Sequence, residues 1–223
     1  MRQICLMKEG YFIWIIKFYQ YSHCSNTMTK KEAISIISKC TASYDANLCN
    51  KQLAFVYRDG NDRTRFVEIT FRSNNFMHFT SINSKKHIKA NAFYRDAIEK
   101  RLKESDIQFK DNHTTELKLQ ILQSIINIPF SARMIGDYIG IHLELYTEKV
   151  TGATTACLGL ILRGNEYKPS TILKEDMRNI TPKPPGKIFA IFRKPIRQDI
   201  YTELTFRSGN IDITFLQTLR FCE

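Results

Sequence analysis

The stretch Tyr167-Lys168-Pro169-Ser170-Thr171-Ile172-Leu173-Lys174-Glu175-Asp176-Met177-Arg178 brings hydroxyl, ammonium, carboxylate and guanidinium groups close together in sequence. It follows a strand-like run of small and apolar residues, Thr154-Thr155-Ala156-Cys157-Leu158-Gly159-Leu160. Pro169 predicts a turn because its ring restricts φ, and Ser170 or Thr171 is typical of a helix N-cap. Such runs are most often a solvated loop and a helix start. The alternative is an anion site, because amides at a helix start also face anions.

Helical patterns lie mainly upstream of this stretch. Thr29-Lys30-Lys31-Glu32 has the pattern of a capping box, which predicts a helix over about 29–43. Apolar residues at helical spacing predict two more helices, over 91–103 and about 117–128, the last stopped by Pro129. Between the first two helices, Leu53-Ala54-Phe55-Val56-Tyr57 and Phe66-Val67-Glu68-Ile69-Thr70-Phe71 predict two strands joined by a turn.

Strand patterns dominate the rest of the chain. Segments rich in Thr, Ile, Phe and Tyr fit a pleated surface and predict strands at 141–149, 154–162, 187–194, 200–206 and 211–217. Helices concentrated in the first half and an antiparallel sheet in the second define an α+β domain.

The first 27 residues are set apart from this pattern. The apolar run Tyr11-Phe12-Ile13-Trp14-Ile15-Ile16 is too short to span a bilayer, and no convincing signal-peptide cleavage site follows it. Met28 begins a more regular segment. We therefore expect residues 1–27 to be an N-terminal extension outside the native fold, and residues 28–223 to form a single domain.

Charge points to a polyanionic partner. The chain has 33 Lys and Arg against 22 Asp and Glu, a formal net charge of +11, and counterion release from phosphates favours binding of such a chain to nucleic acid. Solubility alone is the alternative, and an anionic membrane is a weaker one because no basic amphipathic helix is evident. The six cysteines lack a CxxC pair or regular spacing, which indicates reduced thiols in the cytoplasm. We expect no structural metal and no cofactor.

Four stretches upstream of residues 167–178 resemble, in their order along the chain, the motifs of a known family. They are Phe76-Met77-His78-Phe79-Thr80, Phe93-Tyr94-Arg95-Asp96-Ala97, Thr115-Glu116-Leu117-Lys118-Leu119 and Leu145-Tyr146-Thr147-Glu148-Lys149. Together with residues 167–178, they make the chain resemble the fourth subfamily of phage-associated nuclease-like proteins of the barnase–EndoU–colicin–RelE group, over about residues 28–206. The resemblance implies a helical segment packed on a curved, mainly antiparallel sheet. It also implies metal-independent RNA cleavage, in which a ribose 2′-hydroxyl attacks its own phosphate.

Four residues are the catalytic candidates. His78 is the acid/base candidate because an imidazole titrates near neutral pH; alone, it is more typical of a half-buried histidine bound to backbone. Lys149 ends the expected strand 141–149 and precedes a turn, where a solvated charge is usual, and the resemblance implies a phosphate ligand or transition-state cation. Thr171 would orient a phosphate or cap a helix. Arg178 would lie with Lys174 on one helix face, at i,i+4, as a phosphate cradle.

Five residues are the substrate-binding candidates: Thr80, Lys118, Tyr138, Lys174 and Asp176. Tyr138 would stack on a base, although core packing is the more common role for such a tyrosine. Asp176 falls off the face shared by the two basic residues and would instead hold Arg178 or a neighbouring strand. Cys157 is expected to be buried.

Taken with these residues, the resemblance implies a metal-independent endoribonuclease of phage or mobile-element origin, with RNA as its partner and no membrane association. One departure stands beside it, because the chain lacks a compact His/Glu/Arg set. The alternative is an inactive nuclease-like fold that binds nucleic acid or a host protein, as a modulator of host defence. A third possibility is a toxin held in check by an antitoxin protein. Convergence of the polar candidates in one cleft would favour the enzyme.

Overall fold

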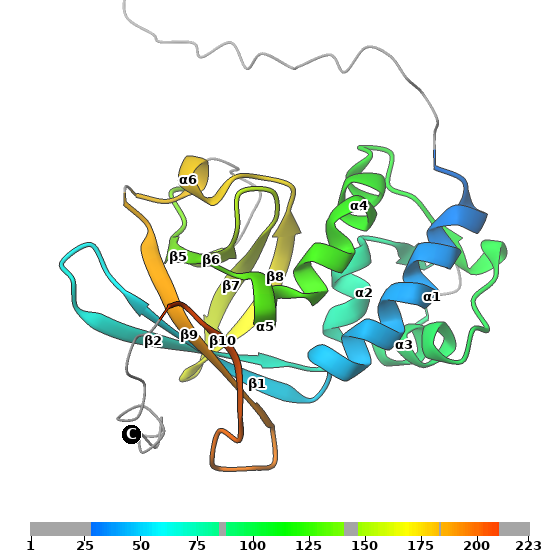
Figure 1. Ribbon diagram of the computed structural model, residues 1–223. Coiled ribbons are helices and arrows are strands. Elements are labelled where there is room, and N and C mark those ends of the chain that lie inside the picture. Colours follow the sequence, from blue (N-terminus) through cyan, green and yellow to red (C-terminus); the bar gives the residue numbers. More distant parts are fainter. Residues whose placement is uncertain (1–27, 85–87, 141–146, 183, 210–223) are drawn as a thin grey trace, which may run out of the picture.

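The computed structural model describes residues 28–84, 88–140, 147–182 and 184–209 (Figure 1). The expected N-terminal extension, the expected strand 211–217 and most of the expected strand 141–149 lie outside the described residues. Among the described residues, no helix has the length and apolar character needed to cross a membrane.

The helices of the described chain are mostly short. Their bounds are α1 Lys30–Asn47, α2 Asn75–Thr80, α3 Ala90–Ile98, α4 Thr114–Ile126, α5 Ile128–Ser131 and α6 Met177–Ile180. The capping box at the start of α1 is confirmed, since Thr29 N donates to Glu32 Oε2 at 2.7 Å and Glu32 N donates to Thr29 Oγ1 at 3.2 Å. Pro129 was expected to end the helix before it. That helix, α4, does end at Ile126, and Pro129 lies in the first turn of α5, where a missing N–H costs nothing.

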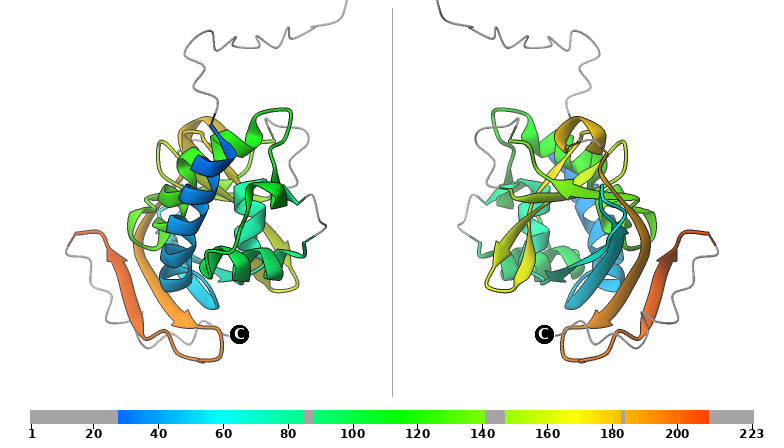
Figure 2. Two further views of the ribbon diagram at one scale, coloured as in Figure 1. Left: turned by 90° about the vertical axis from the view of Figure 1, so that its right-hand side faces the viewer. Right: turned by 90° about the vertical axis from the view of Figure 1, so that its left-hand side faces the viewer.

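The strands form one large sheet that closes on itself. Their bounds are β1 Lys51–Arg58, β2 Thr64–Phe71, β5 Met134–Asp137, β6 Lys149–Gly152, β7 Cys157–Arg163, β8 Glu166–Leu173, β9 Gly186–Pro195 and β10 Glu203–Arg207. The order is β1-β2-β8-β7-β6-β5-β9-β10, and pairing of β1 with β9 closes the first seven into a barrel. All pairs are antiparallel except β2 with β8. Figure 2 shows β10 on the outer side of β9. A separate two-stranded ladder joins β3 Asn83–Ser84 to β4 Ile107–Gln108.

The α+β class is confirmed, and so are the two strands expected in the first half of the chain; the structure adds that they belong to the same sheet as the later strands. Strands β1 and β2 come from the first half of the chain and complete the barrel. The long strand β9 supplies the reason: its N–H and C=O groups pair with β1 along the full length of that strand. This long-range pairing cannot be read from local patterns.

The expected turn at Pro169 and the expected helix start at Thr171 are also wrong. Both residues lie in β8, which pairs with β7. Pro169 is tolerated because the register shifts beside it, at a β-bulge. The helix begins only at Met177, and its cap is Asp176, whose Oδ1 accepts from Arg178 N at 2.9 Å.

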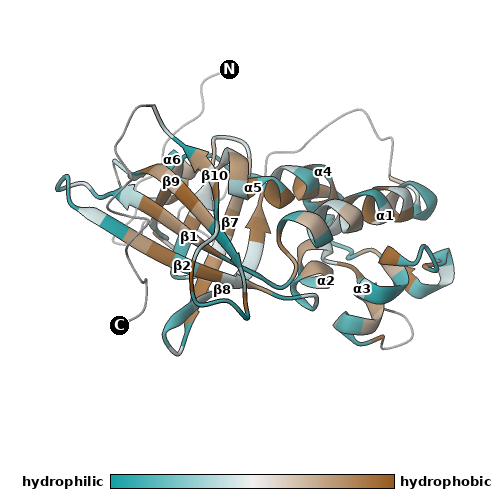
Figure 3. Cartoon of the chain, turned by 60° about the horizontal axis from the view of Figure 1, so that its bottom comes forward, coloured by the Kyte–Doolittle hydropathy of each residue, from teal (hydrophilic) through white to brown (hydrophobic). Residues whose placement is uncertain are grey.

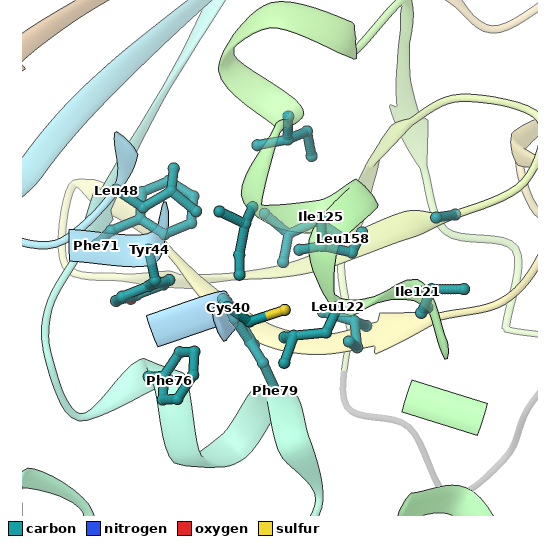
Figure 4. Packing of buried hydrophobic residues seen from close by; sticks show 14 of the residues in the cluster. Cys40, Tyr44, Leu48, Phe71, Phe76, Phe79, Ile121, Leu122, Ile125 and Leu158 are labelled. Atoms are coloured by element: carbon teal, nitrogen blue, oxygen red, sulfur yellow. The ribbon is translucent and has the colours of Figure 1, made fainter. Parts of the chain in front are cut away.

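The core lies where helices α1 to α4 gather beside the start of β1 and the end of β8 (Figure 1). Tyr44 of α1 and Phe76 of α2 are fully buried, with ring centroids 5.1 Å apart (Figure 4). Leu158 of β7 and Leu122 of α4 join the same cluster. Apolar colour follows the strands, whereas the β1–β2 hairpin tip is hydrophilic (Figure 3). The barrel is therefore closed by helices at one end of its strands.

Candidate functional site

Two side-chain hydrogen bonds lie close together between α4 and the barrel wall. Lys118 Nζ of α4 donates to Thr171 Oγ1 of β8 at 3.1 Å. Ser170 Oγ of β8 lies 3.0 Å from Thr147 Oγ1, which precedes β6. These four residues are called the hydroxyl–lysine cluster. It unites two residues that the sequence indicated, Lys118 and Thr171, with two that it did not.

Gly159 of β7 forms the floor of the hydroxyl–lysine cluster. A Cβ at this position would lie 2.9 Å from Thr147 Oγ1, 2.9 Å from Thr171 Cγ2 and 3.0 Å from Ser170 Oγ. The β-bulge opposite Gly159 places both Ser170 and Thr171 beside it, because the extra residue breaks the strand's alternation of faces. Only a residue without a side chain leaves room for three hydroxyl-bearing side chains here.

Lys118 has an unusual electrostatic environment. Burial lowers its pKa to about 8, and the positive charge of Lys110 acts in the same direction. Among the described residues, its ammonium has no carboxylate within ion-pair distance; its hydrogen-bond acceptor is the Thr171 hydroxyl. A desolvated lysine of this kind either releases its proton or attracts an anion. The cluster thus offers one cation and several hydroxyl donors to an anionic group.

The expected cradle of Lys174 and Arg178 on one helix face is wrong, because the helix begins after Lys174. Lys174 instead donates to Gln120 Oε1 of α4 at 2.8 Å. Arg178 is exposed and is held by Asp176, with Arg178 Nη2 2.6 Å from Asp176 Oδ2. The expectation that Asp176 holds Arg178 is confirmed, and side-chain hydrogen bonds from Arg178 lower the pKa of that carboxyl.

His78 and Thr80 both lie in α2, on different sides of it. Phe76 and Phe79 are buried, whereas His78 is exposed, so the interpretation of His78 as half-buried is wrong. Thr80 is fully buried, and its hydroxyl donates to Met77 O at 2.8 Å. Within the described residues, neither side chain takes part in the hydrogen bonds of the hydroxyl–lysine cluster.

Lys149 begins strand β6 and does not end a strand as expected. Its ammonium forms an ion pair with Asp137 of β5, beside the phenols of Tyr57 and Tyr167. Burial alone would lower the pKa of Lys149, but hydrogen bonding and charge from Asp137, together with the two tyrosines, raise it overall. These four residues are called the barrel mouth. Lys149 is therefore a paired, half-buried cation and not a solvated charge.

Tyr138 packs against a small apolar cluster under α6, formed by Val150, Cys157, Met177 and Ile180. The more common role for this tyrosine, core packing, is thus confirmed. Cys157 is buried as expected, and its thiol donates to Glu175 O at 3.0 Å.

The residues that the sequence did not indicate share one property: their neighbours come from distant strands. Thr147, Gly159 and Ser170 meet through the bulge, and Tyr57 and Tyr167 meet Lys149 through barrel closure. The local pattern that bears on these residues is Ser170-Thr171 directly after Pro169, and this pattern favours a helix cap. The candidates therefore fall into separate places: Lys118 and Thr171 meet in the hydroxyl–lysine cluster, and Asp176 and Arg178 pair elsewhere.

Most of the chain matches the model of a known protein family. The model of the family described as phage-Barnase-EndoU-ColicinE5/D-RelE like nuclease4 matches residues 36–209. The chain therefore belongs to this family of nuclease-like proteins. Neither the search of curated proteins nor the search of solved structures found a match.

Proposed function

We propose that this protein is an endoribonuclease and that the hydroxyl–lysine cluster binds the scissile phosphate. The observation that carries the proposal is Lys118, a largely buried cation that faces hydroxyls and, among the described residues, no carboxylate. An uncompensated desolvated charge is costly, and an anionic substrate would offset that cost. The net charge of +11 supports a polyanion as this substrate.

The chemistry that fits these groups is transesterification. The 2′-oxygen of a ribose forms a bond to the adjacent phosphorus, the bond from phosphorus to the 5′-oxygen breaks, and a 2′,3′-cyclic phosphate results. Lys118, whose pKa is about 8, is protonated at neutral pH and donates its proton to the departing 5′-oxygen. The hydroxyls of Thr171, Ser170 and Thr147 donate to the non-bridging oxygens as their charge grows. A proton acceptor for the 2′-hydroxyl completes the reaction, and exposed His78 is the candidate for it.

The ammonium of Lys118 supplies the positive charge in this scheme, so the proposed reaction is metal-independent. The test is cleavage of structured and total cellular RNA by purified protein in excess EDTA. Wild type is expected to cleave, and Lys118→Met and Thr171→Val are expected to lose at least about 100-fold in rate, which is typical for a general acid or a charge-stabilising donor. His78→Ala tests the proton acceptor.

The control variant is Lys168→Met, which removes an exposed lysine from the same strand as Thr171. It is expected to cleave at the wild-type rate. Full activity of a folded Lys118→Met variant would remove the cluster from the mechanism. Activity that EDTA abolishes and Mg²⁺ restores would contradict metal independence.

A second candidate function is binding without catalysis, to nucleic acid or to a host or antitoxin protein. The observation that favours it is the scatter of His78, Lys149 and Arg178, none of which shares a hydrogen bond with the hydroxyl–lysine cluster in the described chain. Folded wild-type protein that binds RNA but leaves it intact in the assay above would establish this function instead.

A further inference from the structure

The barrel mouth lies at the strand ends that point away from the helices. Because α1 leads into the start of β1, Tyr57 lies near the far end of that strand. Tyr167 lies near the start of β8, and Lys149 begins β6 opposite Asp137, the last residue of β5. Arg65 of β2 pairs in register with Tyr57 and adds a second cation on the same face. Together with Arg65, the barrel mouth therefore presents two phenol rings beside two basic groups.

The two tyrosines are partly buried and remain neutral. Burial raises the pKa of Tyr57 and of Tyr167, although the nearby charge of Lys149 opposes the rise. Tyr57 is fixed in place, because a Cβ on Gly186 of β9 would lie 2.5 Å from Tyr57 Cδ2. A ring packed this closely on backbone is a rigid platform and loses little entropy when a ligand stacks on it.

The cations Lys149 and Arg65 each pair with a carboxylate, and one member of each pair is exposed to solvent. The side chain of Asp137 is 71% exposed in its ion pair with Lys149, and Arg65 Nε lies 3.3 Å from Asp59 Oδ2 with its own side chain 51% exposed. Ion pairs that reach solvent contribute little to stability, so a phosphate can replace the carboxylate at small cost. Aromatic platforms beside exchangeable cations are the recognition elements of single-stranded nucleic acid.

We propose that the barrel mouth binds an unpaired nucleotide of the RNA, with its base stacked on Tyr167 or Tyr57 and its phosphate held by Lys149 and Arg65. This inference rests on the proposed function and names a subsite for it. The chain supports a continuous path: Thr147 of the hydroxyl–lysine cluster precedes Lys149 by two residues, and Ser170 follows Tyr167 by three. The strands β6 and β8 thus link the cluster to the mouth.

The experiment measures binding of a short, fluorescent 2′-O-methyl RNA, which lacks the attacking hydroxyl and remains intact. A matched oligonucleotide without bases reports phosphate contacts alone. Tyr167→Leu is expected to weaken binding of the normal oligonucleotide about tenfold and to leave binding of the abasic one unchanged. Lys149→Met is expected to weaken both.

Two control variants accompany these. Tyr167→Phe keeps the ring and is expected to bind like wild type, and Phe66→Leu removes an exposed aromatic one position from Arg65, on the other face of β2. Equal binding of the normal oligonucleotide by Tyr167→Leu, Tyr57→Leu and wild type would overturn the inference. Because binding of an uncleavable RNA is measured, that failure is separate from a failure of cleavage, which the Lys118→Met assay reports.

Discussion

Lys118 shows how one side chain can be ordinary in sequence and unusual in the fold. Its position in an amphipathic helix predicts a solvated lysine, yet α4 lies against β8 and buries most of it. The Thr171 hydroxyl accepts one hydrogen bond from the ammonium but brings no negative charge. The desolvation cost of the lysine therefore remains in the folded protein.

This cost predicts a pH dependence of stability. Burial lowers the pKa of Lys118 from 10.5 to about 8, so between these values the unfolded chain binds a proton that the folded chain does not. The contribution of this group to stability therefore rises with pH across that interval. Lys118→Met is expected to raise the free energy of unfolding at pH 7 by about 1–3 kcal/mol, a difference that shrinks towards pH 10.

Urea denaturation of wild type and Lys118→Met at several pH values between neutral and alkaline measures this difference. Subtracting the two proteins cancels the titration of other lysines, tyrosines and cysteines. A difference that stays constant with pH would show that Lys118 is not desolvated.

Gly159 sets the geometry of the hydroxyl–lysine cluster. Gly159→Ala places a methyl group within 3.0 Å of three side chains, so Thr147, Ser170 and Thr171 must move. We expect a loss of about 1–3 kcal/mol in stability and a loss of RNA cleavage that persists under conditions where the variant is fully folded. Circular dichroism and the cleavage assay measure the two effects. Gly60→Ala, where a Cβ meets nothing within 4 Å, is the control and should change neither.

Among the elements, β8 differs most from the expectation. Proline, serine and threonine in succession indicate a turn and a cap, but β7 offers a ladder of hydrogen bonds along the whole segment. Backbone pairing over eight residues outweighs the local preference of three. The β-bulge accommodates Pro169 within the strand, and it brings both Ser170 and Thr171 beside Gly159.

Strand β10 is attached to the barrel by an ion pair between a buried arginine and an exposed glutamate. Arg193 of β9 is 9% exposed; its Nε lies 2.6 Å from Glu203 Oε2 and its Nη2 lies 2.8 Å from Glu203 Oε1. Glu203→Ala leaves this buried guanidinium with Asn47 O and the ring of Phe130 as its partners among the described residues. We expect a loss of about 1–3 kcal/mol, because the buried guanidinium loses its carboxylate acceptor.

Chemical denaturation measures this loss, and the exposed pair of Asp62 with Arg58 provides the control. Asp62→Ala is expected to change stability by less than about 1 kcal/mol. Hydrogen bonding to Arg193 lowers the pKa of Glu203, so the contribution of this pair is present near neutral pH and is lost as the pH falls through the lowered pKa. Equal stability of Glu203→Ala and wild type would contradict the structural role of the pair.

For the molecule as a whole, the net charge of +11 predicts salt-dependent RNA binding. The logarithm of the association constant should fall linearly with the logarithm of salt concentration, by roughly 0.7 for each phosphate contacted in a single strand. Lys149→Met should reduce that slope by about one contact, whereas Thr171→Val, which removes no charge, should leave the slope unchanged. Fluorescence titrations at several salt concentrations measure it, and a slope near zero would exclude electrostatic RNA binding.

Sequence alone determined what depends on local patterns and totals: the α+β class, the capping box of α1, the amphipathic α4, the basic charge and the family resemblance. It also indicated Lys118 and Thr171 as separate candidates. Tertiary structure decided which residues meet. Barrel closure through β1 and β9, the bulge in β8 and the burial of Lys118 each require contacts between residues far apart in the chain. Local preference amounts to a fraction of a kcal/mol per residue, so where long-range pairing and packing oppose it, they prevail.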